Sequence, residues 1–305
     1  MSDYRAAIVG AGPAGLAAAL TLARAQQPTV VFDADDPPRN AASPGIGGLL
    51  GRDLVEPATL KRSGIEEIER YGSVRFIHRN VADIETRPSG GFTLTADDGT
   101  TTEADSVLLA CGMIDVLPPF EGLDRLWGES VINCPFCHGI ELSDRPWGVF
   151  VNRREMLEVA EIYRMWTNDL TLILDNDIVV EPEREAVLAA SGTRLEYRTI
   201  RRLTGEGAAL ASIEFDDGTA MDYEALVIWP RQRHTDLLAR LGLALNDDGG
   251  IVVDEAYRTE LAGLYAAGDL LYAGHQNVNT ALHMGNLAAA SMVLDLAMRG
   301  FVRAT

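Results

Sequence analysis

The hydrophobic positions of the chain fall into short apolar runs that alternate with helical patterns. Ala6–Val9 and Thr29–Phe32 are apolar or β-branched runs, and between them lies an alanine-rich stretch, Leu16–Ala25, of helical length. A strand, a helix and a second strand in this order predict a βαβ unit, because parallel strands need a crossover connection between them.

The same alternation continues along the rest of the chain. The pattern predicts helices over Glu56–Tyr71 and Arg154–Trp166, and strands at Val74–His78, Asp83–Glu85, Phe92–Thr95, Ser106–Ala110, Trp147–Val151, Leu170–Leu174, Ala225–Trp229 and Gly263–Asp269. Leu117–Pro119 breaks the pattern and is expected to be a linker. A chain of 305 residues is long enough for about two domains.

A glycine-rich turn joins the first strand to the first helix. It reads Gly10-Ala11-Gly12-Pro13-Ala14-Gly15, and the second strand ends at Asp33, about 20 residues further on. In such a turn the first glycine permits the bend, the second admits a pyrophosphate, and the third allows close packing of helix and strand. The helix N-terminus favours anions, and the carboxylate can hold ribose hydroxyls. These residues predict a dinucleotide site.

The C-terminal part of the chain carries a second cofactor signal. The strand at Gly263–Asp269 ends in Gly268 and Asp269, which suit the ribityl and phosphate groups of a flavin. Four more residues are expected to line the cofactor, Arg39 and Asn40 in the long loop after Asp33, and Cys111 and Gly112 at a strand end. Arg39 could pair with the cofactor phosphates, and a solvated loop arginine is the alternative.

The order of these signals predicts the domain organisation. Residues 1–117 and 246–305 are expected to form a discontinuous flavin domain, with residues 118–245 inserted as a second domain. The predicted fold class is therefore α/β, with two Rossmann-like three-layer domains, the second placed within the first.

A pair of cysteines dominates the inserted segment, Asn133-Cys134-Pro135-Phe136-Cys137-His138-Gly139. Two thiols make half of a four-ligand zinc site, so no metal is predicted, and a redox-active disulfide is the better interpretation. The remaining cysteine, Cys111, lies in an apolar run and is expected to be an inert thiol.

The inserted domain has the outline of a second nucleotide-binding unit without its glycines. Where the phosphate-binding turn should stand, the sequence is Asn152-Arg153-Arg154-Glu155-Met156-Leu157. The next strand ends at Asp175 and Asp177, which would repel a 2′-phosphate. The sequence therefore predicts that NADPH does not bind there in the usual way.

Composition narrows the classes of partner. The net charge of −19 and the lack of a Lys/Arg-rich stripe argue against nucleic acid. The apolar runs fall short of a membrane span, the N-terminus lacks an export signal, and three cysteines fit a reducing compartment. We expect a soluble, cytoplasmic protein.

With these motifs in this order, the chain resembles the low-molecular-weight thioredoxin reductases. Within that family, the sequence CPFCHG followed by Ile140-Glu141 is most similar to the dithiol oxidases of gliotoxin, holomycin and romidepsin biosynthesis. The resemblance implies an FAD-containing homodimer. It assigns Gly10, Gly12, Gly15 and Asp33 to the ADP half, Val81 to adenine, Asp269 to the ribityl chain, and Gln276, Asn277 and Val278 to the isoalloxazine. The reductases have an aspartate after the second cysteine, where this chain has His138.

The resemblance also suggests a mechanism. A free thiol has a pKa of about 8.5, so thiol exchange at neutral pH needs a base, and His138 is placed to be that base. Cys134 is expected to form the mixed disulfide with a small-molecule dithiol, Cys137 to face the flavin, and O2 to accept the electrons as hydrogen peroxide. A histidine without a proton-transfer role is the alternative for His138. His275 and His283 are weaker candidates for the site.

Two other functions fit parts of the sequence. One is a flavin disulfide reductase that receives electrons from ferredoxin or another donor than NADPH, although the negative charge disfavours an acidic iron–sulfur partner. The other is a protein that sequesters a reactive dithiol without turnover. Sequestration requires neither the cysteine pair nor the flavin motifs. The sequence does not identify the dithiol or the physiological electron acceptor.

Overall fold

The computed structural model describes residues 3–34, 36–271 and 276–304, and His275 therefore lies outside the described residues. The chain divides into two compact units. The first unit comprises Met1–Arg39, Pro57–Ile114 and Gln232–Thr305, and the second comprises Asn40–Glu56 and Asp115–Arg231. Two strands lie where the chain passes from one unit to the other, β7 (Ile114–Val116) and β16 (Arg231–Arg233), and they pair.

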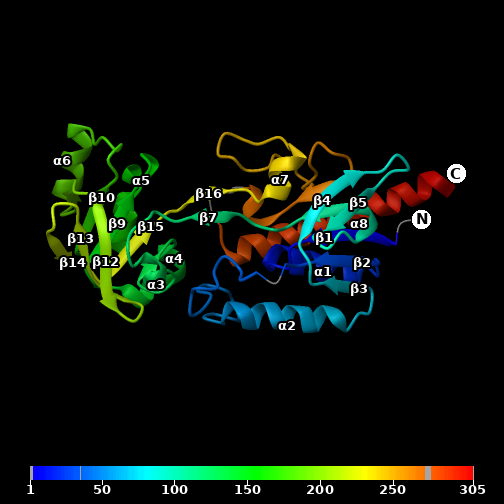
Figure 1. The fold of residues 1–305 in the computed structure, drawn as a ribbon, viewed down its shortest axis with the longest axis horizontal. Coiled ribbons are helices and arrows are strands. Elements are labelled where there is room, and N and C mark those ends of the chain that lie inside the picture. Colours follow the sequence, from blue (N-terminus) through cyan, green and yellow to red (C-terminus); the bar gives the residue numbers. More distant parts are fainter. Residues whose placement is uncertain (1–2, 35, 272–275, 305) are drawn as a thin grey trace. The chain divides into compact units, whose positions relative to one another are not determined.

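The first unit is built on a seven-stranded sheet with the order β3-β2-β1-β6-β5-β4, and β17 pairs with β6 (Figure 1). Its strands are β1 (Tyr4–Val9), β2 (Thr29–Phe32), β3 (Val74–Ile77), β4 (Val81–Thr86), β5 (Phe92–Ala96), β6 (Thr101–Leu109) and β17 (Leu264–Ala266). Its helices are α1 (Pro13–Arg24), α2 (Pro57–Glu69), α7 (Asp236–Leu241), η3 (Gly268–Leu271) and α8 (Val278–Ala304). The predicted βαβ unit and second helix are confirmed, and the strands predicted at Asp83–Glu85 and Phe92–Thr95 are present as β4 and β5, which pair as an antiparallel hairpin.

Side chains of the central strands of the first unit point alternately to the two faces of the sheet, and a separate core covers each face. In β1, Ala6 and Ile8 face a core that includes α1 and α8, whereas Ala7 and Val9 face a core that includes the β4–β5 hairpin and α7. Successive residues of a strand point to opposite faces, so a strand buried on both faces is apolar throughout. The three-layer Rossmann-like architecture predicted for this unit is thus confirmed.

The second unit has a parallel five-stranded sheet with the order β11-β10-β9-β15-β8, and an antiparallel three-stranded sheet, β12-β13-β14. Its strands are β8 (Val131–Ile132), β9 (Trp147–Val151), β10 (Leu170–Leu174), β11 (Arg194–Glu196), β12 (Ile200–Glu206), β13 (Ala209–Phe215), β14 (Ala220–Asp222) and β15 (Ala225–Ile228). Its helices are α3 (Leu123–Leu126), α4 (Pro135–His138), η1 (Ile140–Leu142), α5 (Glu155–Glu158), η2 (Ala160–Met165) and α6 (Pro182–Ala190). One core packs Leu188 of α6 against β9, and the other packs β9 against β12 and β13.

The division into units differs from the predicted ranges at three places, of which the shortest is residues 115–117, which group with the second unit. Residues 232–245 group with the first unit, because Leu237 and Leu238 of α7 pack in the same core as Val81 and Ile84. The loop Asn40–Glu56 groups with the second unit instead of the flavin domain. The functional assignment of the ranges 1–117, 118–245 and 246–305 stays a prediction.

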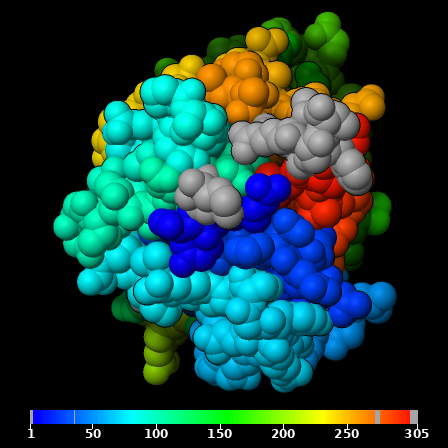
Figure 2. Space-filling model, turned by 90° about the vertical axis from the view of Figure 1, so that its right-hand side faces the viewer, coloured from blue at the N-terminus to red at the C-terminus, as the bar shows by residue number. Residues whose placement is uncertain are grey.

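Helix α8 is the longest apolar element of the described chain. Its segment Val278–Met298 is long and apolar enough to cross a membrane by length and composition alone. It also packs closely on α1, because a Cβ atom at Gly285 would lie 2.0 Å from the carbonyl oxygen of Ala14. Core helices of water-soluble proteins pass the same test, so this segment is weak evidence for a membrane span. Figure 2 shows a face on which this helix (red) and the N-terminal residues (dark blue) both reach the surface.

Candidate active site

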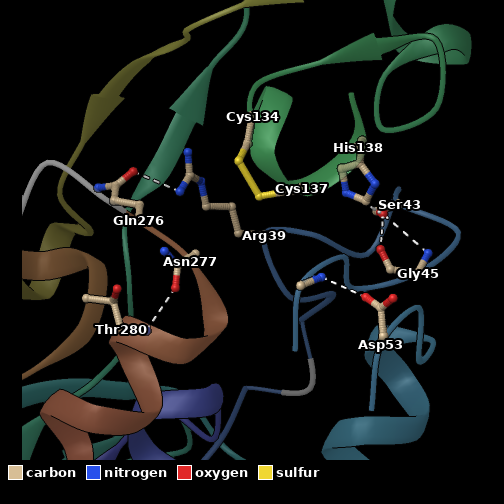
Figure 3. Close-up of a disulfide and its surroundings, with 11 residues drawn as sticks. Arg39, Ser43, Gly45, Asp53, Cys134, Cys137, His138, Gln276, Asn277 and Thr280 are labelled. Carbon is tan, nitrogen blue, oxygen red and sulfur yellow. Dashed lines mark hydrogen bonds between the residues drawn. A yellow bond between two sulfur atoms is a disulfide. The ribbon is translucent and has the colours of Figure 1, made fainter. Parts of the chain in front are cut away.

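The two cysteines of the CxxC motif form a disulfide at the start of α4 (Figure 3). Cys134 has an extended backbone, and Pro135 occupies the first helical position, where its missing N–H costs nothing. The backbone N–H groups of Cys137 and His138 both donate to the carbonyl oxygen of Cys134 at 3.2 Å. One short turn therefore carries both sulfur atoms and the histidine.

The loop Asn40–Glu56 packs directly on this turn. A Cβ atom at Gly47 would lie 1.8 Å from the carbonyl oxygen of Cys137, so no larger residue fits there. A bridge between Ile46 and Val55 closes the loop, and the Asp53 carboxylate accepts the Gly48 N–H at 2.8 Å. The expectation that this long irregular segment lines a site agrees with its contact to the cysteine pair.

His138 is half-buried at the end of α4 and faces the same loop. Its Nε2 lies 3.1 Å from the hydroxyl oxygen of Ser43. Burial lowers the pKa of His138 below its ordinary value of 6.5, and the negative charge of Glu141 opposes this shift. The imidazole is therefore mainly neutral at pH 7, the form that can accept a proton.

Apolar side chains accompany the cysteine pair. Phe136, between the cysteines, is 63% exposed and makes an edge contact with Trp166, and Ile140 in the next turn is 73% exposed. Trp166 also leaves no room for a side chain at Gly139, because a Cβ atom there would lie 2.8 Å from the indole ring. The surface next to the disulfide is thus apolar on a protein that is otherwise strongly acidic.

The residues of the predicted dinucleotide site form a cradle in the first unit. Gly10 has a φ of 104°, and a Cβ atom there would lie 2.6 Å from the carbonyl oxygen of Ala110. Gly15 packs against the Gly10 carbonyl, whereas a Cβ atom at Gly12 would meet nothing within 4 Å. The Asp33 carboxylate accepts the Ala11 N–H at 3.3 Å. Open space before a helix N-terminus, bordered by this carboxylate, fits the ADP half of FAD.

A second cluster in the first unit connects the other predicted flavin residues. Arg39 Nη1 donates to Gln276 Oε1 at 2.8 Å and to Asp269 Oδ2 at 3.1 Å. Gln276 also exchanges two amide hydrogen bonds of 2.8 Å with Gln232. The predicted pairing of Arg39 with cofactor phosphates stays a prediction. The network brings Arg39 next to Asp269 and Gln276, which lie more than 200 residues away in the sequence, and their role at a flavin stays a prediction.

The remaining candidates have simpler environments. Asn277 Oδ1 caps α8 by accepting the Thr280 N–H at 2.9 Å, and Val278 begins that helix. Val81 is buried at the start of β4, and His283 is exposed on α8. Burial raises the pKa of the Cys111 thiol to about 11, which agrees with an inert thiol. Asn40 begins the loop Asn40–Glu56, and Gly112 follows β6 with a φ of 67°. Their contact with the cofactor stays a prediction.

Three residues at these sites were not singled out from the sequence. Ser43 contacts His138, and Gln232 contacts Gln276. Lys61 of α2 lies 2.5 Å from Asp33 Oδ2. Each contact joins segments that are distant in sequence, so no local motif indicated them.

The predicted second nucleotide turn is occupied by its own side chains. Asn152 Nδ2 donates to the carbonyl oxygen of Trp229 at 2.9 Å, and Arg153 Nη2 donates to those of Trp229 and Pro230 at 3.1 and 3.2 Å. These residues follow β9 and β15, the neighbouring strands between which the strand order reverses. In open parallel sheets nucleotides bind at this point, so the residues present do not fit a pyridine nucleotide in the usual position.

The helix expected after this turn is also different. In place of a helix over Arg154–Trp166, the structure has the four-residue α5 and the 3-10 segment η2. Arg184 of α6 donates to the carbonyl oxygen of Leu157, which an α-helix would use for its own i→i+4 bond. This turn is therefore not followed by a long α-helix, whose N-terminus and dipole would hold a pyrophosphate.

Comparison with known proteins decides the family. The family model described as pyridine nucleotide-disulphide oxidoreductase matches residues 4–285. The chain belongs to this family. Its members with the present architecture bind FAD, and the predicted resemblance to thioredoxin reductase-like proteins is confirmed. This oxidoreductase is therefore a thioredoxin reductase-like FAD enzyme.

Relatives of this oxidoreductase cover nearly its whole length. Thioredoxin reductase sirT of Leptosphaeria maculans is 29% identical over 285 residues, which cover 88% of this chain and 87% of the relative. Thioredoxin reductase tcpT of Claviceps purpurea is 29% identical, with 93% and 91% covered. Among solved structures, the putative thioredoxin reductase TrxB of Bacillus anthracis has a TM-score of 0.91 at 30% identity, covering 97% of this chain and 99% of that chain. HlmI has a TM-score of 0.89 at 30% identity, with 99% and 96% covered.

Two glycines of the cradle, Gly12 and Gly15, are expected to respond differently to substitution by alanine. Gly12→Ala should leave the fold intact, because the added Cβ meets no protein atom, yet it should weaken FAD binding by filling space before α1. Gly15→Ala should destabilise the fold, since its Cβ would lie 1.9 Å from a backbone oxygen. Flavin content and thermal unfolding of both variants check this. Normal FAD content in Gly12→Ala would contradict the placement of the pyrophosphate.

Proposed function

We propose that this FAD oxidoreductase is a dithiol oxidase. It would convert a small-molecule dithiol into a disulfide through Cys134 and Cys137 and pass the electrons to O2, with hydrogen peroxide as product. FAD, when bound, supplies the two-electron exchange between the cysteine pair and oxygen. The observation that carries the proposal is a disulfide with a half-buried histidine on the same turn, in a chain whose nucleotide turn is filled by its own side chains.

The filled turn argues for the direction of electron flow. A reductase of this family needs a donor that reduces the flavin, and the usual position for NADPH is occupied by Asn152 and Arg153. Both side chains would have to leave carbonyl partners at the strand ends before a pyrophosphate could approach. If NADPH does not deliver electrons, a dithiol substrate can be their source.

The side chains present can carry out the exchange in balanced steps. His138 takes the proton of a substrate thiol, and the thiolate attacks Cys134 so that Cys137 leaves as a thiolate. The second substrate thiol then gives its proton to the Cys137 thiolate, attacks the first substrate sulfur and releases Cys134, which takes the proton held by His138. Two electrons and two protons pass from the substrate to the protein, which ends as a dithiol.

The surroundings of the disulfide favour an apolar substrate. Phe136 and Ile140 expose large side chains on the segment that carries the cysteines, and such surfaces bind apolar groups by removing them from water. A small neutral dithiol suits this surface.

A reductase with a donor other than NADPH is the second candidate, because relatives carry the name thioredoxin reductase. An acidic iron–sulfur protein would need a basic docking surface, and the chain has 45 acidic and 26 basic residues. The oxidase remains the better candidate. A protein that sequesters a dithiol without turnover would have no use for the cysteine pair or the flavin cradle.

One anaerobic experiment separates these functions. NADPH, dithiothreitol and reduced ferredoxin are each mixed with the holoenzyme, and loss of flavin absorbance is followed. We expect rapid bleaching by the dithiol and none by NADPH, and then, in air, about one peroxide for each disulfide formed. Fast bleaching by NADPH with micromolar binding in calorimetry would restore an ordinary reductase, and bleaching by ferredoxin alone would favour the second candidate.

We further propose that the enzyme is a homodimer whose partner covers α8. Leu287, Leu294 and Met298 are 39%, 67% and 63% exposed, and their spacing places them along one side of the helix. Exposed apolar stripes of this kind are typical of subunit contacts.

We expect light scattering to give about twice the chain mass of 33.0 kDa. Leu294→Glu should shift the enzyme to monomers, whereas Val187→Glu on α6 should not, and a monomeric wild type at micromolar concentration would refute the proposal.

A further inference from the structure

The hydroxyl group of Ser43 has its single proton committed to a backbone carbonyl. Ser43 Oγ lies 2.6 Å from the carbonyl oxygen of Gly45. A carbonyl oxygen has no proton to give, so Ser43 is the donor in this hydrogen bond. The same Oγ accepts the Gly45 N–H at 3.3 Å.

This assignment determines the hydrogen bond to the histidine. His138 Nε2 lies 3.1 Å from Ser43 Oγ, and the serine has no second proton to donate (Figure 3). The imidazole must therefore donate from Nε2. A neutral imidazole has one N–H, so the lone pair of His138 is on Nδ1.

We infer that Ser43 is a positioning residue that holds His138 as the Nε2–H tautomer, so that Nδ1 is the nitrogen that accepts the substrate proton. This inference rests on the proposed function of the site, which it deepens by naming the residue that makes the base competent. Without Ser43, the Nδ1–H tautomer becomes accessible, and in that form the proton-accepting nitrogen is no longer Nδ1.

The loop is built to keep Ser43 in place. Ser43 is 8% exposed, and a Cβ atom at Gly45 would lie 2.7 Å from the carbonyl oxygen of Leu54, which shows how tightly the loop closes. Gly47 rests on the backbone of Cys137. The hydroxyl is thus fixed relative to the same turn that carries His138.

Ser43 can keep its hydrogen bond to His138 before and after the histidine takes up a proton. In the thiol exchange, one proton leaves the substrate sulfur and one thiolate leaves the protein disulfide. A proton taken on Nδ1 makes an imidazolium, and its Nε2–H keeps the same bond to Ser43 Oγ. The serine therefore supports both protonation states without changing its own hydrogen bonds.

The first test is spectroscopic and needs no turnover. The oxidised holoenzyme is labelled with ¹⁵N-histidine, and long-range ¹H–¹⁵N correlation spectra are recorded near pH 8, with His138→Gln used to assign the resonance. The proposal expects the Nε2–H pattern in the wild type, and a mixed or Nδ1–H pattern in Ser43→Ala. An unchanged pattern in Ser43→Ala, or an Nδ1–H pattern in the wild type, would overturn it.

The second test separates positioning from general damage. Ser43→Ala should slow anaerobic flavin reduction by dithiothreitol roughly tenfold. The loss should vanish in a His138→Ala background, because the serine acts through the histidine. Ser130→Ala is the matched control, since Ser130 is also buried, donates to a carbonyl at 2.6 Å and accepts an N–H at 2.9 Å. An equal loss with and without His138 would overturn the proposal.

The two proposals fail in different ways. If dithiothreitol reduces the flavin but the wild type yields no peroxide in air, the oxidase function is wrong, and the tautomer of His138 still decides the role of Ser43. If peroxide forms but Ser43→Ala keeps both the tautomer and the rate, the function stands and the assignment of Ser43 falls.

Discussion

Cys137→Ser is expected to abolish dithiol oxidation while FAD stays bound. The serine hydroxyl cannot form the disulfide with Cys134, and the bond between these two sulfur atoms is the group that accepts electrons from the substrate. The flavin cradle is built from Gly10, Gly12 and Asp33, on other segments of the chain. Oxygen uptake with dithiothreitol and the flavin spectrum of the purified variant measure both parts of the prediction.

The two cysteines should fail differently. Cys134→Ser loses the sulfur expected to be attacked by substrate, and Cys137→Ser loses the sulfur expected to face the flavin. In Cys137→Ser the free Cys134 thiol should therefore attack a disulfide form of a substrate analogue, giving a mixed disulfide and releasing one thiol of the analogue, seen by mass spectrometry, without reduction of the flavin. Full activity in Cys137→Ser would show that the proposed order of electron transfer is wrong.

His138→Ala should slow thiol oxidation by about 10² to 10⁴, the range typical of a lost general base. Burial lowers the pKa of His138 below 6.5, against the opposing charge of Glu141, so the neutral base predominates at pH 7. The wild-type rate should therefore fall as the pH drops through the pKa of His138. The variant should lack this acid limb and regain activity at high pH, where substrate thiols with a pKa of about 8.5 ionise by themselves.

A pH–rate profile of flavin reduction by dithiothreitol tests this expectation. His78→Ala is a suitable control, because His78 is an exposed histidine that follows β3. The control should keep the wild-type profile. A profile of His138→Ala that matches the wild type in shape and height would leave His138 with a structural role alone.

Local sequence determined the parts of the protein that depend on neighbouring residues. The turn from Gly10 to Gly15 predicted the cradle because each glycine meets a backbone constraint within the βαβ unit itself. Spacing alone predicted that Cys134 and Cys137 pair, and their positions, three apart with two residues between them, suit one helical turn. Apolar runs such as Ala6–Val9 predicted buried parallel strands, since both faces of the sheet are covered.

Tertiary structure decided the features that join distant segments. In place of the helix predicted over Arg154–Trp166 the chain has α5 and η2, and Arg184 of a distant segment donates to the Leu157 carbonyl. Nothing in the local pattern distinguishes i→i+3 from i→i+4 bonding. The sequence 152–157 predicted the loss of the nucleotide turn, but the bonds to Trp229 that fill it form only when β9 and β15 become neighbours.

The environment of the proposed base, His138, is also determined by contacts between distant segments. The sequence placed His138 beside the cysteines, and so predicted a base. In our proposal the tautomer of that base depends on Ser43, 95 residues away in the chain, and on the Gly45 carbonyl that accepts the serine hydrogen bond. Residue types thus determine which reactions are available, whereas hydrogen bonds between segments brought together by folding determine which atom acts, because a proton's position depends on both of its neighbours.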